Sequence, residues 1–298
     1  MSAAPEASDS ADGGLVAFLA EVADHVAQHR PALTPLLDVF VQEAKFARQS
    51  IDARLRELPP GAAILEVGAG LMLMSCHLRA LGYEVHALEP IGHGFSGFAE
   101  LQDVVLAFAR SRGVGPRVLP IPVEDLQEVS RYDFAFSLNV MEHVGSVPEA
   151  IACVGRALRP GASYLFICPN YLFPYEPHFN MPTLGSKRLT EKVLGRRILA
   201  SKAVPDPQGT WHSLNWINVL QVGRVCRKHT DLACSFDRTL LATFFERAAH
   251  DPGFAARRGE AIAWVASAIV RSGLSRALRF LPAALQPVMK CTLTKAGA

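Results

Sequence analysis

Short apolar runs alternate with stretches of helical spacing between residues 61 and 170. The runs predict five strands, at residues 64–67, 86–88, 117–123, 133–138 and 163–169. A stretch of helical spacing at residues 147–158 separates the last two of them. Strands that alternate with helices are typical of a parallel sheet with helices on both faces. The pattern therefore predicts an α/β core with a doubly wound sheet over residues 61–170.

Two amphipathic stretches precede this core, and a proline separates them. They predict helices at residues 15–29 and 32–58, and the Pro-Pro-Gly sequence at 59–61 marks the boundary with the core. We expect these N-terminal helices, residues 15–60, either to cover the mouth of a ligand site or to pack on the sheet edge. Residues 1–14 are rich in Ala, Ser, Asp and Gly, a composition that predicts a disordered tail.

The region after the core, residues 171–298, contributes further elements. Residues 232–236 and 287–295 predict two more strands, which bring the sheet to seven mostly parallel strands. Between them, residues 240–281 predict a mostly helical insertion. We interpret residues 171–298 as a substrate-binding or lid region that also supplies the last strands of the sheet.

The first two predicted strands each end in an acid, and a glycine pair follows the first strand. The acids are Glu66 and Glu89, and the glycines are Gly68 and Gly70. A doubly wound sheet needs this pattern to hold an adenosine at the carboxyl ends of its first two strands. The glycines let the backbone approach the ligand closely, and the Glu89 carboxylate can accept both ribose hydroxyls.

Two adenosine-bearing ligands compete for this site. A dinucleotide site requires G-x-G-x-x-G, with a pyrophosphate at a helix N-terminus, and Leu73 stands at the third glycine position. The Glu66 carboxylate would also repel a pyrophosphate, whereas it suits a ligand with an ammonium and a sulfonium group. That ligand is S-adenosylmethionine, although an ordinary strand–turn–helix without a ligand would show a similar pattern.

Residues 61–170 resemble the class I S-adenosylmethionine-dependent methyltransferases, in particular the broad small-molecule branch. Asp133, Phe134, Glu142 and His143 match the pattern at the end of its fourth strand, and an Arg-Pro-Gly sequence precedes the fifth strand. The resemblance implies a Rossmann-like fold, S-adenosylmethionine as the cofactor and a methyltransferase activity. It implies little about the substrate.

The resemblance also assigns the cofactor residues. Glu66, Gly68, Ala69, Gly70 and Glu89 would hold the cofactor. Ser137, Leu138 and Asn139 would line the methionine part of the cofactor. The adenine would contact the Val123 backbone, and either Glu124 or Asp125 would be its side-chain acceptor, with Glu124 preferred.

Two positions depart from the family pattern. Met72 stands where the family usually has a third glycine, and we expect its side chain to turn away from the cofactor. Pro122 stands where the family often has an Asp that accepts a hydrogen bond from the adenine amino group, which a proline cannot do.

The segment after the fifth strand, residues 170–182, is aromatic and too rich in proline for a helix. Because ligands bind outside the carboxyl ends of such strands, we expect this segment to line the substrate pocket. His178 within it is the first candidate for a general base, since imidazole titrates near the working pH. His143 and His212 are the alternatives, and each of the three histidines could instead be structural.

Composition excludes several function classes. The net charge of +2 gives no argument for nucleic-acid binding. Six cysteines without a C-x-x-C pair favour a reducing cytosol, and no His/Cys pair has the spacing of zinc ligands, so we expect no metal site. No apolar run reaches the ~18 residues of a spanning helix, and no signal peptide is evident, which predicts a cytoplasmic protein.

The C-terminal end is basic. Residues 251–298 carry seven Lys or Arg and two acids, a net charge of +5, and aromatic and aliphatic residues alternate with the arginines. Such a stretch could rest on an anionic membrane surface, or it could be a helix with one buried face and one solvated basic face.

The sequence thus predicts a methyltransferase that acts on a small-molecule acceptor, with oxygen as the methylated atom. A second hypothesis is methylation of a sugar or lipid-linked saccharide in the assembly of cell-surface glycans, which the basic C-terminal end favours. A third is a cofactor-binding docking platform without transferase activity, which Met72 and the missing adenine acid favour.

Overall fold

The computed structural model describes residues 6–90, 97–228, 231–250 and 260–297. The described chain forms two compact units. Unit 1 takes its residues from Met1–Leu138, Ala152–Tyr164 and Lys295–Ala298, and unit 2 from Asn139–Ile151 and Leu165–Thr294.

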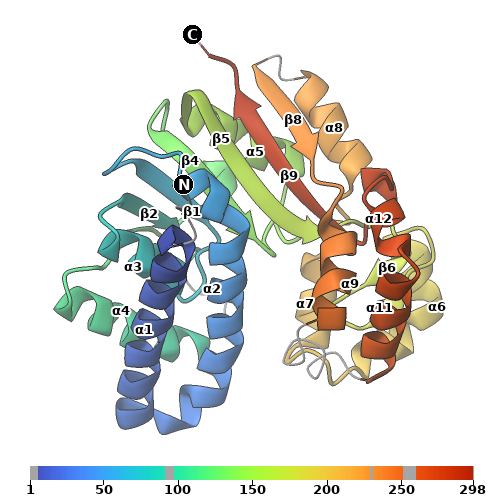
Figure 1. Ribbon diagram of the computed structural model, residues 1–298, viewed down its shortest axis with the longest axis horizontal. Helices are drawn as coiled ribbons and strands as arrows, with labels where there is room; N and C mark the ends of the chain where they lie inside the picture. Colours follow the sequence, from blue (N-terminus) through green and yellow to red (C-terminus); the bar gives the residue numbers. More distant parts are fainter. Residues whose placement is uncertain (1–5, 91–96, 229–230, 251–259, 298) are drawn as a thin grey trace, which may run out of the picture. The chain divides into compact units, whose positions relative to one another are not determined.

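A seven-stranded sheet has the strand order β3-β2-β1-β4-β5-β9-β8 (Figure 1). Its strands are β1 (Ala63–Val67), β2 (Glu84–Leu88), β3 (Arg117–Leu119), β4 (Tyr132–Leu138), β5 (Leu158–Pro169), β8 (Leu232–Phe236) and β9 (Val288–Lys295). β1 pairs in parallel with both β2 and β4, and β2 pairs in parallel with β3. The strand order therefore reverses beside β1, which is the doubly wound, mostly parallel Rossmann-like arrangement that the sequence predicts. Ligands bind outside the carboxyl ends of the strands at such a reversal.

The helices of unit 1 bury an apolar core with the sheet. They are α1 (Glu6–His29), η1 (Pro31–Leu33), α2 (Thr34–Leu55), α3 (Leu73–Ala80), α4 (Phe98–Ser111) and η2 (Val123–Asp125), while α5 (Val147–Ala157) begins in unit 2. All five residues of β1 are buried, as expected for a central parallel strand. Leu19 and Val22 of α1, Leu37 of α2, and Leu101 and Val105 of α4 share one core cluster. Each such side chain contributes about 1.5–3 kcal/mol on full burial.

The ends of several elements differ from the sequence expectation. Helix α1 begins at Glu6, inside the segment expected to be disordered, and residues 1–5 lie outside the described residues. Alanine is the strongest helix former and acids near an N-terminus favour the helix dipole, so this composition also supports a helix. β3 ends at Leu119, because Pro120 and Pro122 follow. β5 starts at Leu158 and so includes the Arg-Pro-Gly sequence.

Unit 2 contains a short antiparallel hairpin, a set of helices and, from the seven-stranded sheet, β8, nearly all of β9 and the second part of β5. The hairpin joins β6 (Tyr175–Glu176) and β7 (Met181–Pro182). The helices are α6 (Lys187–Leu199), α7 (Pro207–Ser213), α8 (Val219–Lys228), α9 (Leu240–His250), α11 (Glu260–Arg271), α12 (Leu274–Leu278) and η3 (Ala283–Leu285), and part of α5. α9, α11 and α12 lie within the helical insertion expected at residues 240–281, of which residues 251–259 lie outside the described part.

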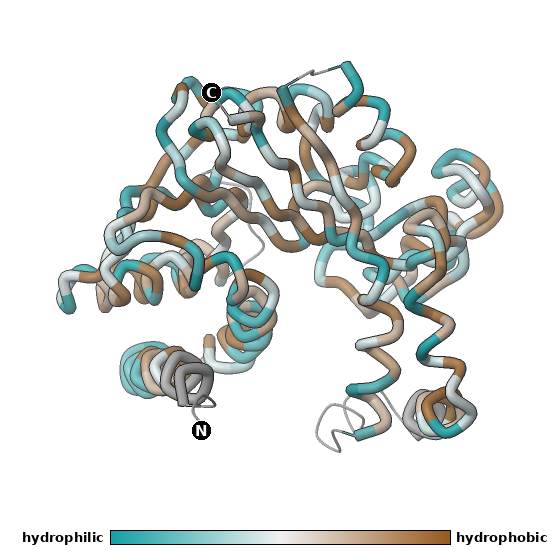
Figure 2. Tube along the Cα trace, turned by 45° about the horizontal axis from the view of Figure 1, so that its top comes forward, coloured by the Kyte–Doolittle hydropathy of each residue, from teal (hydrophilic) through white to brown (hydrophobic). Residues whose placement is uncertain are grey.

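Hydrophobic and hydrophilic positions alternate along the helices, as amphipathic helices require (Figure 2). Among the described residues, no helix combines the length and the apolar character needed to cross a membrane.

Candidate functional site

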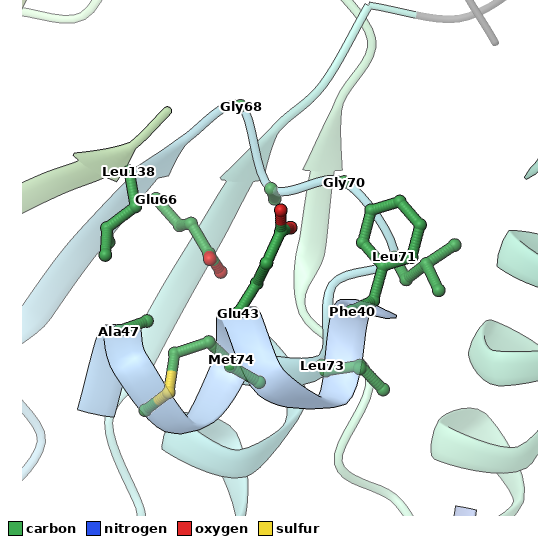
Figure 3. A pocket seen from close by; sticks show the side chains of 12 residues that line it. Phe40, Glu43, Ala47, Glu66, Gly68, Gly70, Leu71, Leu73, Met74 and Leu138 are labelled. Atoms are coloured by element: carbon green, nitrogen blue, oxygen red, sulfur yellow. The ribbon is translucent and has the colours of Figure 1, made fainter. Parts of the chain in front are cut away.

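A pocket in unit 1 lies at the carboxyl end of β1 (Figure 3). Glu66, Gly68, Ala69 and Gly70 line it from β1 and the loop that follows, and Leu138 lines it from the end of β4. Helix α2 lines the other side with Phe40, Glu43, Ala44 and Ala47. The carboxylates of Glu43 and Glu66 reach into the space between α2 and the loop (Figure 3). Helix α2 thus lines this pocket, and its role as a cover for the mouth of a ligand site stays a prediction.

The loop after β1 depends on its glycines. Gly68 has φ 69° and Gly70 has φ 51°, a region that L side chains rarely adopt. A Cβ atom at Gly70 would lie 3.5 Å from the Phe40 ring. The Gly70 N–H donates to Oε2 of Glu89 at 2.8 Å, and Gln102 Nε2 donates to the Gly70 carbonyl at 2.7 Å. The loop is thus fixed with its backbone against the pocket and with Glu89 beside it.

Glu66 gives the pocket its charge preference. Its side chain is buried and accepts a hydrogen bond from the Ser75 hydroxyl. Burial raises the pKa of Glu66 to about 8, and the nearby Glu89 carboxylate adds to this, while the hydrogen bonds from Ser75 oppose it. A cationic ligand would compensate the cost of the buried carboxylate. The carboxylates of Glu66 and Glu89 and the glycine loop between them therefore fit S-adenosylmethionine, which carries both an ammonium and a sulfonium.

Met72 is not among the residues that line this pocket, and the expectation that its side chain turns away from the cofactor stays a prediction. It caps α3 in the left-handed region, with φ 60°, which explains why a glycine suits this position. Its side chain packs with Ala69, Cys76, Ala87 and Leu106 in a separate core cluster.

Several expected cofactor residues have other contacts. The Ser137 hydroxyl shares a hydrogen bond of 2.7 Å with the Tyr164 hydroxyl. Val123 and Glu124 lie in η2, after β3, and Asn139 has φ 54° just beyond β4. These four residues are not among those that line the pocket, so their contact with a cofactor stays a prediction.

A second group of polar side chains, which includes two of the candidate bases, lies wholly in unit 2. We call it the histidine–carboxylate cluster, and it comprises Glu142, His143, Glu176 and His178. Nδ1 of His178 is 2.6 Å from Oε1 of Glu176, and its Nε2 is 4.0 Å from Oε1 of Glu142. The rings of His143 and His178 have centroids 5.4 Å apart. One ligand atom from each of Glu142, His143 and His178 lies within 4.8 Å of the other two.

Glu176 is the centre of a hydrogen-bond network that orients His178. Its carboxylate also accepts from the Tyr171 hydroxyl at 3.2 Å and from the Phe179 N–H at 2.7 Å. Burial alone would raise the pKa of Glu176, but the hydrogen bonds and the charge of His178 outweigh it and lower the pKa. Because an ionised carboxylate only accepts, Nδ1 of His178 is its donor, and Nε2 is left with a lone pair when the ring is neutral.

Like His178, His143 carries its ring proton on Nδ1. Its Nδ1 is 2.8 Å from Oγ of Ser213, and the hydroxyl of Ser213 donates to the Thr210 carbonyl at 2.9 Å. The serine oxygen therefore accepts from Nδ1–H, which leaves the lone pair on Nε2. Burial and, to a smaller extent, the neighbouring His178 lower the pKa of His143 to about 4 against the opposing charge of Glu176, so His143 is neutral at pH 7.

His212, the third candidate base, lies apart from these contacts. It is exposed on α7, and its Nδ1 bonds the Gln208 carbonyl at 2.8 Å. The next residue, Ser213, is the one that contacts His143.

Four aromatic side chains pack beside the Tyr171 end of the network. Tyr171 stacks on Trp216 at 4.3 Å, Trp211 meets Trp216 edge-on, and Phe179 meets Trp211 edge-on. The indole nitrogens of Trp211 and Trp216 are buried without a hydrogen-bond partner among the described residues. Two unsatisfied donors in an aromatic setting are suited to a ligand with polar atoms.

Sequence reasoning missed several of these residues. Phe40 and Glu43 belong to an amphipathic helix whose side chains gave no sign of which residues would face a ligand. Glu176 stood two positions before His178 in the aromatic segment, and its nearness to His178 was the available signal. Nothing in the sequence linked Ser213 to His143, because seventy positions separate them.

Comparison with known proteins identifies the family. The sequence model of a family described as a methyltransferase domain matches residues 40–248, which is more than half of the chain. An uncharacterized protein of Mycobacterium tuberculosis is 46% identical over 281 residues, which cover 93% of this chain and 94% of that protein. A ubiquinone biosynthesis O-methyltransferase of Rickettsia bellii is 28% identical over 97 residues, which cover 33% of this chain and 38% of that enzyme.

Among solved structures, the phosphoethanolamine N-methyltransferase 2 of Haemonchus contortus in complex with S-adenosyl-L-methionine is 14% identical, with a TM-score of 0.48. The match covers 84% of this chain and 53% of that one, so the chain spans about half the length of that enzyme. With the family match over most of the chain and a pocket suited to its cofactor, this chain belongs to the class I S-adenosylmethionine-dependent methyltransferases.

Proposed function

We propose that this enzyme methylates an oxygen atom of a small-molecule acceptor, and that the acceptor hydroxyl loses its proton at the histidine–carboxylate cluster. A cytoplasmic location belongs to the same proposal, and the six cysteines, all of them free thiols, support it.

The observation that carries this proposal is the place of the cluster in the chain. Glu142 follows Leu138 by four residues, and Leu138 lines the cofactor pocket. Four residues span at most about 14 Å, so the chain itself limits the distance between the backbones of Leu138 and Glu142. A hydroxyl acceptor gains from groups that ionise it, whereas many amine acceptors need none.

The reaction is an in-line displacement, for which S-adenosylmethionine supplies an electrophilic methyl group on a sulfonium. The chain has to align the acceptor and take care of its proton. Nε2 of His178 is the atom we expect nearest the hydroxyl, because Glu176 fixes the ring from the other side. Nε2 of His143 is the alternative. The unsatisfied indole N–H groups of Trp211 and Trp216 can orient polar atoms of the acceptor.

A lipid-linked saccharide is the second candidate acceptor, and the exposed aromatic side chains near α11 and α12 of unit 2 favour it. Trp264 of α11 is 69% exposed and Phe280, just after α12, is 82% exposed. Arg271 and Arg276 lie on the same two helices. Apolar side chains among cations are suited to an anionic lipid surface, on which such an acceptor would be presented. Binding to anionic but not to neutral vesicles would support this candidate over a free small molecule.

Calorimetry tests the first step of the proposed function. We expect S-adenosylmethionine and S-adenosylhomocysteine to bind in the micromolar range, and NADH not to bind. Release of S-adenosylhomocysteine is then followed against matched pairs of acceptors that differ only in a hydroxyl or an amino group. Turnover of the amine alone would overturn methylation at oxygen, and tight cofactor binding without turnover of either class would favour the docking platform.

A further inference from the structure

We propose that Glu142, His143 and His178 together bind one divalent transition-metal ion of the zinc type. The binding itself does not depend on the proposed methylation; only the catalytic role of the ion rests on it. The sequence predicted no metal site, because no His/Cys pair has the short spacing of zinc ligands. The fold instead brings the Glu-His pair after β4 next to a histidine of the β6–β7 hairpin.

The distances between the three side chains suit a common ion after a small adjustment. Their ligand atoms lie within 4.8 Å of one another, and the Glu142–His178 pair is 4.0 Å apart. Ligands at about 2.0–2.1 Å from a tetrahedral zinc ion lie about 3.4 Å from each other. Side-chain movements of about 1 Å would therefore close the set, and His143 and His178 are partly exposed and can make them.

The hydrogen bonds behind the ligands are those of a metal site. A histidine that binds a metal almost always donates its other ring N–H to a carboxylate, a carbonyl or a water. Here Nδ1 of His178 donates to Glu176, and Nδ1 of His143 donates to Ser213. Both bonds hold the tautomer that keeps the Nε2 lone pair available. Tyr171 and Phe179 in turn fix Glu176.

The third ligand, Glu142, is a buried carboxylate that suits a cation. Glu142 is 0% exposed, and a cation next to a buried carboxylate offsets the cost of its desolvation. Asn215 fixes the backbone around Glu142. The Asn215 side-chain amide donates to the carbonyls of Met141 and Val144, and the Asn215 backbone N–H donates to the Glu142 carbonyl. Two imidazoles and one carboxylate are a ligand set of zinc enzymes, whereas Mg²⁺ prefers oxygen ligands.

Three protein ligands leave at least one coordination position for the acceptor. An acceptor hydroxyl bound there would have its pKa lowered by the ion, so that its proton leaves to solvent. The resulting oxygen anion would attack the methyl group, forming the C–O bond as the C–S bond breaks and the sulfonium becomes a neutral thioether. His178 would then act as a ligand, and Glu176 as a positioning residue behind it.

Titration of the full-length, tag-free chain with Zn²⁺ tests the proposal, with Mg²⁺ as the comparison ion. We expect one equivalent of Zn²⁺ to bind and Mg²⁺ to bind at least 100-fold more weakly. His143→Ala and His178→Ala should each weaken Zn²⁺ binding by 100-fold or more, and Glu176→Gln by about 10- to 100-fold. His250→Ala, which removes an exposed histidine of α9, is the matched control and should bind like the wild type.

A second measurement on the unaltered protein guards against variants that fail to fold. Co²⁺ should give the intense visible absorption of a site with fewer than six ligands, and one equivalent of Zn²⁺ should remove it. Equal Zn²⁺ binding by the wild type and both histidine variants, or no saturable Co²⁺ spectrum, would overturn the proposal. Metal binding without methyl transfer would leave the metal site standing and would count against the proposed function alone.

Discussion

The cofactor pocket of unit 1 and the histidine–carboxylate cluster of unit 2 are built in opposite ways. The pocket takes Glu66, Gly68 and Gly70 from one strand and the loop after it, and Glu89, at the end of the next strand, accepts a hydrogen bond from the Gly70 N–H. The cluster takes its side chains from the turn after β4 and the β6–β7 hairpin, and Ser213 of α7 supports it.

This difference decides what each region can do. In the pocket, backbone conformation and parallel pairing place the ligand groups, because the ends of adjacent parallel strands meet at one edge of the sheet. In the cluster, Glu176 orients His178 from two positions away, Ser213 supports His143 from seventy positions away, and the fold brings Glu142 and His143 to His178. The first arrangement suits a cofactor shared by a family, and the second can change with the acceptor while the pocket is kept.

The strongest test of this comparison separates catalysis from cofactor binding. His178→Ala should lower kcat/KM for methyl transfer by roughly 10²- to 10⁴-fold, the range for loss of a group that ionises the acceptor. The affinity for S-adenosylmethionine should stay within about twofold, as judged by calorimetry. His250→Ala should change neither quantity. A parallel loss of cofactor affinity would show that the two regions are not independent.

Glu89→Ala is the converse change, with a smaller expected effect. It removes the acceptor of the Gly70 N–H and the group we expect at the ribose hydroxyls. Hydrogen bonds to a charged group contribute about 1.5–3 kcal/mol, so the Kd for S-adenosylmethionine should rise by roughly 10- to 100-fold. Glu100→Ala, at an exposed acid of α4, serves as the control. Unchanged affinity for the cofactor in the Glu89 variant would place the ribose elsewhere.

The proton on Glu66 offers a further test of the pocket, because binding of the cofactor should release it. With its pKa near 8, Glu66 holds a proton in the free protein at pH 7, and a bound cation should lower that pKa. Binding of S-adenosylmethionine should therefore release up to one proton and tighten by up to about tenfold per pH unit as the pH rises towards 8, with a plateau above. Calorimetry in buffers of different ionisation enthalpy measures this release. Glu66→Gln should abolish it; proton uptake by the wild type would contradict the assignment.

The smallest expected effect concerns Met72. Its φ of 60° penalises any residue with a Cβ by roughly 1–2 kcal/mol. The free energy of unfolding of Met72→Gly, measured in urea, should therefore be about 1 kcal/mol higher than that of Met72→Ala, although both variants lose the buried side chain. At Asp103, an exposed position inside α4, the order should reverse, because glycine costs about 0.5–1 kcal/mol relative to alanine in a helix. The same order at both positions would remove backbone strain as the explanation.

The helices show where local signals were sufficient and where they were not. The spacing of apolar residues placed α2 and α5 and the strands of the core, because burial on one face requires that spacing wherever the element packs. It did not reveal that Phe40 and Glu43 of α2 line the cofactor pocket, since that depends on how α2 lies over the loop after β1. Nor could it show that Ser137 is bonded to Tyr164, 27 positions away.

The sequence by itself determined the cofactor half of this protein. The pattern consists of an apolar run, an acid, two glycines and a second acid. It specifies a strand, a tight loop and the end of the next strand, because each of these forms through local backbone preferences and the pairing of adjacent strands. Only the tertiary structure decided the other half. It brought His143 to Ser213 and gathered Glu142 and His143 with His178, because these contacts join segments whose distance in the chain carries no information about their distance in space.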